Sequence, residues 1–469
     1  DVAPSRGLGD VYKRQYEGRI IMVKIVKFGG SSLADAHQFK KVGDIIKSDP
    51  DRRFVVPSAP GKRFKDDIKV TDLLYKAYNA ESEQEFECTF DTIKDRYQSI
   101  IDELNLTVDL TEEFEVIKKN FQDQISEEYA ASRGEYLNGI LLANYLGFEF
   151  VDPATCIFID EHGNYDDKKT DPVLSKKLSE VENCVIPGFY GSCSEDPTKI
   201  RTFSRGGSDV TGSIVAKCGQ VKLYENWTDV SGFLVADPRI VKNPEVIGTI
   251  TYKELRELSY MGASVLHENA VFPIRSQGIP IVIKNTNKPE DAGTLIVEST
   301  VHKPDHIITG ISGKQGFATI MIEKDMMNDE IGFGRKVLQV IEEAGLSYEH
   351  TPSGIDTMNV IVELNSFIEH EQEILANLHR AVEPDSIELE SDLALIAIVG
   401  RGMKDGRGVA AKVFTALANK KINVKMIDQG SSELNIIVGV KNIHFNDAIR
   451  AIYNTCLLYT SPSPRDGAT

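Results

Sequence analysis

Short apolar runs alternate with amphipathic stretches along the chain from Met22 to about Asn287. The apolar runs have the length of buried strands and lie at residues 22–26, 54–57, 185–187, 221–224 and 281–284. Apolar residues recur at helical spacing in residues 35–46, 113–121, 136–146 and 252–258. This alternation predicts an α/β fold, in which helices cover both faces of a mainly parallel sheet and ligands bind at the carboxyl ends of its strands.

The last third of the chain contains an internal repeat, because residues 336–362 align without gaps on residues 412–438, at an offset of 76 residues. Each copy predicts a strand, a glycine-containing loop, a helix, a strand, a turn and a strand, which together make a small α+β unit. The junctions before the two helices, residues 331–335 and 405–408, suit an amino-acid carboxylate, because helix N-termini attract anions. We therefore expect the repeat to bind a ligand and not to catalyse a reaction.

The composition argues against several classes of protein. A formal net charge of −18 disfavours nucleic acid and anionic membranes as partners, although local basic residues can still bind an anionic nucleotide. The longest apolar runs have only the length of strands, so we expect no transmembrane helix. The six cysteines include no C-x-x-C pair, which favours reduced thiols in a cytoplasm over disulfides or a zinc site. With 469 residues, the chain is long enough for two or three domains.

The two ends of the chain are expected to be non-native. Residues 5–14 and 457–466 can be read from opposite strands of one DNA repeat, which is typical of translated sequencing adapter. We therefore set residues 1–21 and 456–469 aside, and expect the native chain to begin at Met22 and to be truncated near Thr455.

A lysine and two glycines follow the first apolar strand, in the sequence Lys27-Phe28-Gly29-Gly30-Ser31. Glycines at the end of a strand let backbone N–H groups approach an anion closely, and the lysine adds a compact positive charge. The pattern predicts a polyphosphate site, although it is not a Walker motif, since the lysine precedes the glycines. A flexible turn with a solvated lysine is the alternative.

A second glycine pair occurs at residues 205–209, Arg-Gly-Gly-Ser-Asp, before an apolar helix that is expected to begin near Val210. Ser208 or Asp209 could simply cap that helix. An arginine, a glycine pair and a helix N-terminus also form a cradle for anions. Together with Lys27, the segment predicts a catalytic site in which Asp209 lies beside the phosphates.

Two further segments carry candidate binding residues. Glu135, in the sequence Ser-Arg-Gly-Glu, is expected in the first turn of the helix at 136–146, where the helix dipole alone would favour an acid. The functional alternative is that Glu135 binds the ammonium group of an amino-acid substrate while Arg205 pairs with its carboxylate. The turn-rich loop at residues 227–239 contains an aromatic residue, a glycine and an Asp/Arg pair, which suit an adenine and ribose pocket.

Together these motifs resemble the aspartate kinases of the amino-acid kinase family, over the chain from Met22 to about Thr455. The motifs that keep the family's order are Lys-Phe-Gly-Gly-Ser-Ser (27–32), Ser-Arg-Gly-Glu (132–135), Arg-Gly-Gly-Ser-Asp (205–209), Trp-Thr-Asp-Val-Ser-Gly-Phe-Leu-Val-Ala-Asp-Pro-Arg (227–239) and Met-Gly-Ala-Ser-Val-Leu-His-Glu (261–268). The resemblance implies an αβα-sandwich catalytic domain at residues 22–300, followed by two ACT-like, ferredoxin-like α+β regulatory units at residues 301–385 and 386–455. It also implies transfer of the ATP γ-phosphoryl group to the β-carboxylate of L-aspartate, giving 4-phospho-L-aspartate, which is the entry step to lysine, threonine and methionine synthesis.

The resemblance also implies roles for individual residues. Lys27 and Asp209 would be catalytic, and Mg²⁺ would be held mainly by phosphate oxygens, without a dedicated metal site in the protein. The expected phosphate-binding residues are Lys27, Gly29, Gly30, Ser31, Gly206 and Gly207, and the expected aspartate-binding residues are Ser58, Thr71, Glu135, Arg205 and Ser208. The expected nucleotide-binding residues are Thr228, Asp229, Phe233, Asp237, Arg239 and Ser264. The expected effector-binding residues are Phe333, Gly334, Ser353 and Asp356.

Two positions depart from the family's pattern. Ser264 stands where the family commonly has a lysine near ATP, and losing that cation would weaken ATP binding by about 1–3 kcal/mol unless another cation, such as Lys284, replaces it. Residues 59–67 form a longer and more charged segment than the family's short turn, so Thr71 is expected to replace the usual substrate threonine. We expect both departures to be variants within the family.

Lysine is the expected effector, with Asp356 contacting its ammonium group, and threonine, alone or with lysine, is the alternative. ACT-like pairs of this family usually assemble across subunits, so we expect a homodimer or a multiple of one. Two other functions stay open. A related kinase acting on glutamate, acetylglutamate, carbamate or UMP is disfavoured by the repeat, and a non-catalytic amino-acid sensor has only Ser264 in its support.

Overall fold

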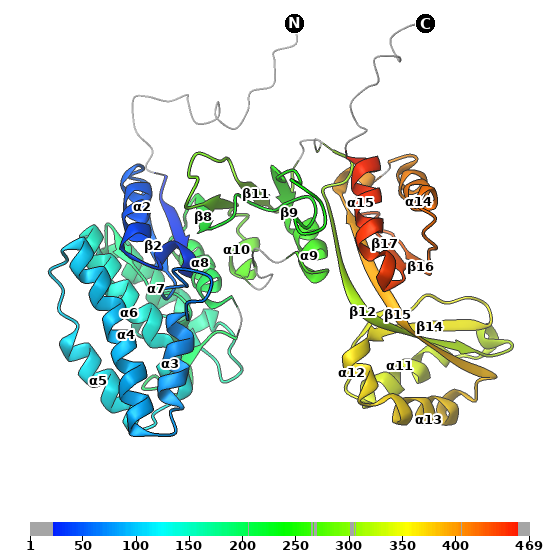
Figure 1. The fold of residues 1–469 in the computed structure, drawn as a ribbon, viewed down its shortest axis with the longest axis horizontal. Coiled ribbons are helices and arrows are strands. Elements are labelled where there is room, and N and C mark those ends of the chain that lie inside the picture. The colour runs from blue at the N-terminus through cyan, green and yellow to red at the C-terminus, as the bar shows by residue number, and fades with distance from the viewer. Residues whose placement is uncertain are drawn as a thin grey trace, which may run out of the picture. The chain divides into compact units, whose positions relative to one another are not determined.

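The computed structural model describes residues 22–204, 206–263, 266, 270–300, 304, 306–404 and 406–457 (Figure 1). The chain divides into two compact units, unit 1 (Asp1–Asp229 and Asn269–Asp291) and unit 2 (Val230–Glu268 and Ala292–Thr469). The domain bounds at residues 300/301 and 385/386 remain a prediction. None of the helices in the described ranges is long and apolar enough to cross a membrane.

Unit 1 is built on the parallel sheet that the alternating pattern predicts. Its strands follow the order β3 (Glu149–Phe150), β5 (Cys184–Val185), β2 (Arg52–Pro57), β1 (Lys24–Phe28), β8 (Leu223–Thr228) and β10 (Ile281–Asn285). All neighbouring strands in this series pair in parallel, which confirms the predicted sheet. A small separate sheet joins β4 (Phe158–Ile159), β6 (Tyr190–Cys193) and β7 (Ile200–Thr202).

Helices pack around this sheet and complete the core of unit 1. They are α2 (Ala36–Lys47), α3 (Val70–Tyr78), α4 (Glu83–Leu104), α5 (Thr111–Gln122), α6 (Glu127–Leu146), α7 (Asp167–Glu180), α8 (Gly207–Cys218) and the short α10 (Phe272–Arg275). Helices α3 to α6 form a bundle beside the sheet (Figure 1). Its buried aromatic residues, among them Phe90, Tyr97 and Phe121, belong to the same core as Val26 and Trp227 of the sheet.

Helix α6 begins nine residues earlier than the hydrophobic pattern indicates, so the expectation that Glu135 lies in a first turn is wrong. The side chain of Ser126 caps the helix by accepting a hydrogen bond from the N–H of Tyr129, at 3.0 Å. Glu135 therefore lies in the middle of α6, far from the N-terminal dipole. The helix buries residues on almost every side, so its sequence lacks the one-sided apolar stripe by which its first turns could have been recognised.

Unit 2 contains the repeat and a segment that precedes it. In that segment β9 (Thr249–Thr251) pairs in parallel with β11 (Thr294–Val297), and α9 (Tyr252–Tyr260) follows β9. The repeat forms an antiparallel sheet in the order β13 (Tyr348–His350), β14 (Thr357–Glu363), β12 (Gly310–Glu323), β15 (Ser386–Val399), β17 (Asn435–Val440) and β16 (Met426–Asp428). The helices of the first copy are α11 (Phe333–Glu343), α12 (Leu364–Ile368) and α13 (Glu371–Val382), and those of the second are α14 (Val409–Asn419) and α15 (Phe445–Cys456).

The two copies of the repeat share their longest strands. Residues 317–323 of β12 pair with β14 and with the first half of β15, in the sheet of the first copy. Residues 310–315 of β12 pair with the second half of β15, which in turn pairs with β17 in the second copy. Figure 1 shows β12 and β15 running side by side between the two groups of helices. The first copy is therefore inserted into the second, an arrangement that a linear repeat does not indicate.

Candidate active site

The structure brings Lys27 and Asp209 into direct contact. Lys27 lies near the end of β1 and Asp209 in the first turn of α8, and the distance from Lys27 Nζ to Asp209 Oδ1 is 2.5 Å. Their side chains are only 10% and 14% exposed. Asn226 of β8 donates a hydrogen bond from Nδ2 to the same Asp209 oxygen at 2.9 Å, and it pairs with Lys27 in the sheet register. The sequence interpretation missed Asn226, although its register on a strand beside β1 was a usable signal.

Helix α8 begins without a side-chain cap, so the prediction that Ser208 or Asp209 caps it is wrong. The N-cap residue is Gly206, whose φ of 58° lies in the left-handed region, and the helix starts at Gly207. Ser208 and Asp209 therefore lie inside the first turn. A β-carbon on Gly207 would lie 2.5 Å from the ring of Phe189, so this glycine lets α8 pack closely there. Arg205 lies outside the described residues.

The loop after β1 is held by backbone contacts. The N–H of Gly29 donates to the carbonyl of Trp227 at 3.0 Å, and residues Gly30–Leu33 form a 3₁₀ turn. A β-carbon on Gly30 would lie 2.7 Å from the carbonyl oxygen of Ala59, whereas one on Gly29 would meet nothing closer than 3.7 Å. Gly30 thus permits close contact between two backbone segments, a need that the motif alone did not indicate.

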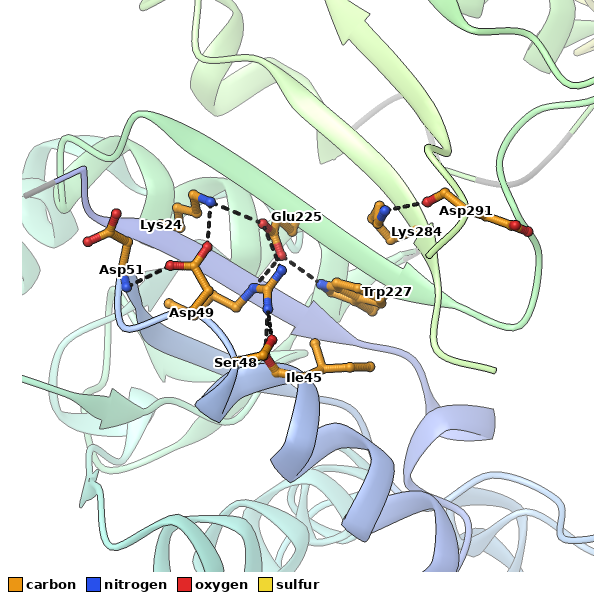
Figure 2. A network of polar contacts seen from close by, with 10 residues as sticks. Lys24, Ile45, Ser48, Asp49, Asp51, Glu225, Trp227, Lys284 and Asp291 are labelled. Carbon is orange, nitrogen blue, oxygen red and sulfur yellow. Dashed lines mark hydrogen bonds and ion pairs between the residues drawn. The ribbon is translucent and has the colours of Figure 1, made fainter. Parts of the chain in front are cut away.

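A buried network on one face of the sheet supports Trp227 (Figure 2). Glu225 is 4% exposed and accepts a hydrogen bond from Trp227 Nε1 at 2.9 Å and from Arg52 Nε at 2.8 Å. Lys24 lies 3.7 Å from the other Glu225 oxygen and 2.6 Å from Asp49. Because the Trp227 carbonyl holds Gly29, the network that fixes Trp227 also helps to fix the loop after β1.

Lys284, considered above as a replacement for a cation at Ser264, is engaged in unit 1. Its ammonium group donates to the backbone carbonyl of Asp291 (Figure 2) and lies 5.6 Å from the centre of the Trp227 ring. Burial lowers the pKa of Lys284. Ser264 lies outside the described residues.

Glu135 is a buried carboxyl group with spare bonding capacity. It is 5% exposed, and burial raises its pKa from 4.5 to about 7, against the opposing effects of the Ala59 N–H and the Lys27 charge. Within the described residues, its Oε2 atom has no hydrogen-bond partner. A buried oxygen of this kind is unfavourable unless a ligand completes its bonding.

The other predicted aspartate-binding residues lie around the same segment. The Ser58 N–H donates to the Phe28 carbonyl at 3.0 Å, and the Ser58 carbonyl accepts from Asn138 Nδ2 at 2.6 Å. Thr71 is in the first turn of α3, where its methyl carbon would lie 3.7 Å from a β-carbon on Gly134. The elements that carry Ser58, Thr71 and Glu135 are therefore neighbours.

Arg133, the arginine of the Ser-Arg-Gly-Glu motif, has a structural role that the motif did not indicate. Its guanidinium lies 4.4 Å, 4.5 Å and 5.2 Å from the ring centres of Tyr129, Tyr136 and Tyr190, and the residue is 6% exposed. Cation–π contacts of this kind fix the middle of α6 and hence the position of Glu135.

The predicted nucleotide-binding residues are divided between the two units. Thr228 ends β8 and Asp229 follows it in unit 1, whereas Phe233, Asp237 and Arg239 belong to unit 2. Phe233 is 1% exposed and its N–H donates to Thr294 Oγ1 at 2.8 Å, so its ring belongs to the core of unit 2. Arg239 Nη2 lies 2.6 Å from Asp237 Oδ2, and this contact lowers the pKa of Asp237.

The predicted effector-binding residues lie in the first copy of the repeat. Phe333 is the first residue of α11, is 4% exposed and packs in the core of the first copy. Gly334 follows it in the first turn of α11, while Ser353 and Asp356 are exposed in the loop before β14. One Asp356 oxygen accepts from the N–H of Met326 at 3.0 Å, and this exposed carboxylate has a second oxygen that could meet a ligand.

Comparison with known proteins identifies relatives along nearly the whole chain. Residues 22–285 match the model of the amino acid kinase family, and residues 396–455 match a model of the ACT domain. Aspartokinase 3 of Bacillus subtilis is 40% identical over 453 residues, which cover 92% of this chain and 98% of that protein. The chloroplastic aspartokinase 1 of Arabidopsis thaliana is 28% identical over 92% of this chain and 79% of its own length.

Two solved structures are also similar to this chain along nearly its whole length. The crystal structure of Clostridium acetobutylicum aspartate kinase, described as an allosteric enzyme, has a TM-score of 0.84 and 50% identity, over 93% of this chain and 100% of that one. Escherichia coli aspartokinase III in complex with aspartate and ADP has a TM-score of 0.73 over 92% of this chain and 99% of that one. At 22% identity, that likeness concerns the fold alone.

Proposed function

Because this chain belongs to the amino acid kinase family and, within it, to the aspartate kinases, we propose specific roles for its residues in the reaction of that family. The enzyme transfers the γ-phosphoryl group of ATP to the β-carboxylate of L-aspartate, giving 4-phospho-L-aspartate, and is regulated by feedback. The observation that supports the proposed roles is the contact between Lys27 and Asp209 at 2.5 Å, beside the Gly29–Gly30 loop and the N-terminus of α8.

Lys27 neutralises negative charge on the transferring phosphoryl group, and Asp209 orients Lys27. Phosphoryl transfer needs positioning and charge stabilisation more than it needs a protein nucleophile. Both side chains are largely shielded from water, which strengthens their electrostatic effect. The other residues proposed to bind the phosphates are Gly29, Gly30, Ser31, Gly206 and Gly207. Gly29 contributes by its close backbone approach, because its N–H already donates to the Trp227 carbonyl.

Glu135 binds the ammonium group of aspartate. Its buried carboxyl has an oxygen without a partner among the described residues and a pKa of about 7, so it can ionise fully when a cation arrives. The remaining contacts to aspartate are proposed for Ser58, Thr71, Arg205 and Ser208. The shared packing of Ala59 and Thr71 against Gly134 supports the grouping of Ser58 and Thr71 with Glu135.

The residues proposed to bind the nucleotide are Thr228, Asp229, Phe233, Asp237, Arg239 and Ser264. ATP brings Mg²⁺, which supplies positive charge to the phosphate oxygens. Among the described residues there is no group of three or more His, Cys, Asp or Glu side chains that could hold a metal ion. Mg²⁺ usually keeps several waters and is bound largely through substrate phosphates, so we propose that the phosphate oxygens of ATP are its main ligands.

Lysine is the proposed effector, at Phe333, Gly334, Ser353 and Asp356 in the first copy of the repeat. The free oxygen of Asp356 suits an ammonium group, and the variant Asp356→Ala should relieve inhibition by lysine. Unchanged inhibition in this variant would contradict the placement. We further propose a homodimer, or a multiple of one, assembled through the repeat. The cysteines that the structure describes are free, which supports a cytoplasmic location.

Aspartate-dependent turnover of ATP with Mg²⁺ present, measured beside glutamate as the alternative substrate, tests the proposal. Turnover with aspartate and none with glutamate is expected. The variant Asp209→Asn separates an enzyme from an amino-acid sensor, because it should lose turnover while it still binds lysine. Turnover with glutamate would favour the rival kinases, and lysine binding without any turnover in the wild type would favour the sensor.

A further inference from the structure

Arg96 of α4 is a buried cation that belongs to none of the sequence motifs described above. The residue is 4% exposed, and its Nη2 atom donates to the Gly61 carbonyl at 2.6 Å. Its Nη1 atom lies 2.8 Å from Asp67 Oδ2. A buried guanidinium is unfavourable unless it is paired, so the contacts of Nη1 and Nη2 fix Arg96 relative to residues 58–67, while its Nε has no partner among the described residues. We call residues 58–67 the bracket segment.

One side of the bracket segment contacts the phosphate loop. The Ser58 N–H donates to the Phe28 carbonyl at 3.0 Å, and the Gly61 N–H donates to the Gly30 carbonyl at 2.8 Å. A β-carbon on Gly61 would lie 2.6 Å from the carbonyl carbon of Gly30, so the two backbones are in closest contact here. Any displacement of Gly61 must therefore move Gly30 and the N–H of Ser31.

The other side of the bracket segment contacts α6. Asn138 donates to the Ser58 carbonyl at 2.6 Å, and the backbone N–H of Ala59 acts on the Glu135 carboxyl, where it opposes the rise in pKa. The neighbour of Arg96, Tyr97, is wholly buried and donates from its hydroxyl to the Gly134 carbonyl at 2.8 Å. Consecutive residues of α4 therefore hold both sides of the proposed substrate site.

We propose that Arg96 is a positioning residue that sets the spacing between the phosphate loop and Glu135, through its hydrogen bond to Gly61. The inference rests on the proposed function, in which the loop holds the phosphates and Glu135 holds aspartate. It also gives the long, charged segment at residues 59–67 a purpose, since Asp67 supplies the buried carboxylate that keeps Arg96 in place. Phosphoryl transfer depends on alignment, and an error of about 1 Å in placement can lower the rate about 100-fold.

The substitution Arg96→Lys tests the proposal. A lysine ammonium can keep an ion pair with Asp67, but it lacks the planar fork that reaches Gly61 at the same time. We expect kcat per folded molecule to fall about 100-fold at saturating ATP and aspartate. The denaturation midpoint, followed by the fluorescence of Trp227, the single tryptophan of the chain, should change little.

Two further variants distinguish positioning from general support of the fold. Arg63→Lys is the matched control, because Arg63 binds the same Asp67 carboxylate at 2.9 Å from a side chain that is 40% exposed. Its kcat should stay within about threefold of wild type. Asp67→Asn leaves the Arg96–Gly61 bond but removes a buried charge, so it should lower the denaturation midpoint more than Arg96→Lys while it retains more kcat per folded molecule.

The outcomes separate the inference from the function on which it rests. A wild-type kcat in Arg96→Lys, or a loss no larger than the loss of folded protein, would overturn the role of Arg96. Equal loss of kcat per folded molecule in Asp67→Asn and Arg96→Lys would also overturn it. Absence of aspartate-dependent turnover in the wild type would instead refute the proposed function.

Discussion

Replacing the buried carboxyl group of Glu135 should stabilise unit 1 while it removes aspartate binding. Burial raises the pKa of Glu135 in the folded protein from 4.5 to about 7, so the folded state binds the proton more tightly than the unfolded state. The protonated Glu135 carboxyl therefore contributes its full share to the free energy of unfolding below pH 4.5, and this contribution is lost as the pH rises to 7. One pKa unit corresponds to about 1.4 kcal/mol, which gives a total loss of about 3 kcal/mol above pH 7 and about 1 kcal/mol at pH 5.

Chemical denaturation of the wild type and of Glu135→Gln at pH 5 and pH 8 measures this effect. Trp227 is the single tryptophan of the chain and lies in unit 1 with Glu135, so its fluorescence follows the relevant unit. The neutral amide does not titrate, so the variant should gain about 2 kcal/mol relative to the wild type between pH 5 and pH 8. Glu127→Gln, an exposed position in the first turn of α6, is the control and should show no such gain.

The pH dependence of KM for aspartate tests the protonation of Glu135 independently of the stability measurement. At pH 6 only about a tenth of Glu135 would be ionised in the free enzyme, so KM for aspartate should rise about tenfold from pH 8 to pH 6. The variant Glu135→Gln should show a high KM for aspartate at both pH values. Equal stability differences at pH 5 and pH 8, together with a flat KM, would refute the reasoning.

Three further substitutions test separate parts of the structure. Asp209→Asn should lower kcat about 1,000-fold in steady-state assays, with circular dichroism unchanged, and a variant that kept a tenth of the activity would contradict its catalytic role. Gly30→Ala should lower the free energy of unfolding by about 1–3 kcal/mol, because the new β-carbon would lie 2.7 Å from a carbonyl oxygen. Gly29→Ala is the control, because its β-carbon would meet nothing closer than 3.7 Å, and it should unfold like the wild type. Glu254→Ala should destabilise unit 2 by about 3–5 kcal/mol in thermal unfolding, because the wholly buried Glu254 carboxylate lies 3.0 Å from Arg401 and its removal leaves that cation unpaired by it. A loss below about 1 kcal/mol would contradict the importance of this ion pair.

The parallel sheet and the repeat were predictable because each depends on a local pattern. The short apolar runs correspond to β1, β2, β8 and β10. Strands of a parallel sheet are covered by helices on both faces, so they are apolar whichever helices cover them. The repeat at an offset of 76 residues appears as two similar sets of strands and helices. A hydrophobic period and the similarity of two segments can both be read from the sequence without knowing which distant residues pair in the fold.

The start of α6 and the interleaving of the repeat could not be predicted in this way. A helix that is buried on nearly all sides gives no amphipathic period, so the capping residue Ser126 was the only local sign of its start. The division of β12 between the two copies of the repeat depends on its pairing with residues about 80 positions further along, in β15. Alignment of the two copies reveals their similarity but not which strands they share.

Three buried charged residues were missed for a related reason. Glu225, Glu254 and Arg96 are charged residues within otherwise apolar surroundings, and each acquires its role from a partner distant in the sequence. Arg96 and Gly61 are 35 positions apart, and Glu254 and Arg401 are 147 apart. A charge inside a buried strand, such as Glu225 in β8, is itself a signal, because the energy of burying it demands an opposite charge nearby. The sequence can therefore indicate that such a residue has a partner, while only the fold identifies the partner and shows, for Glu225, that the pair supports the loop after β1.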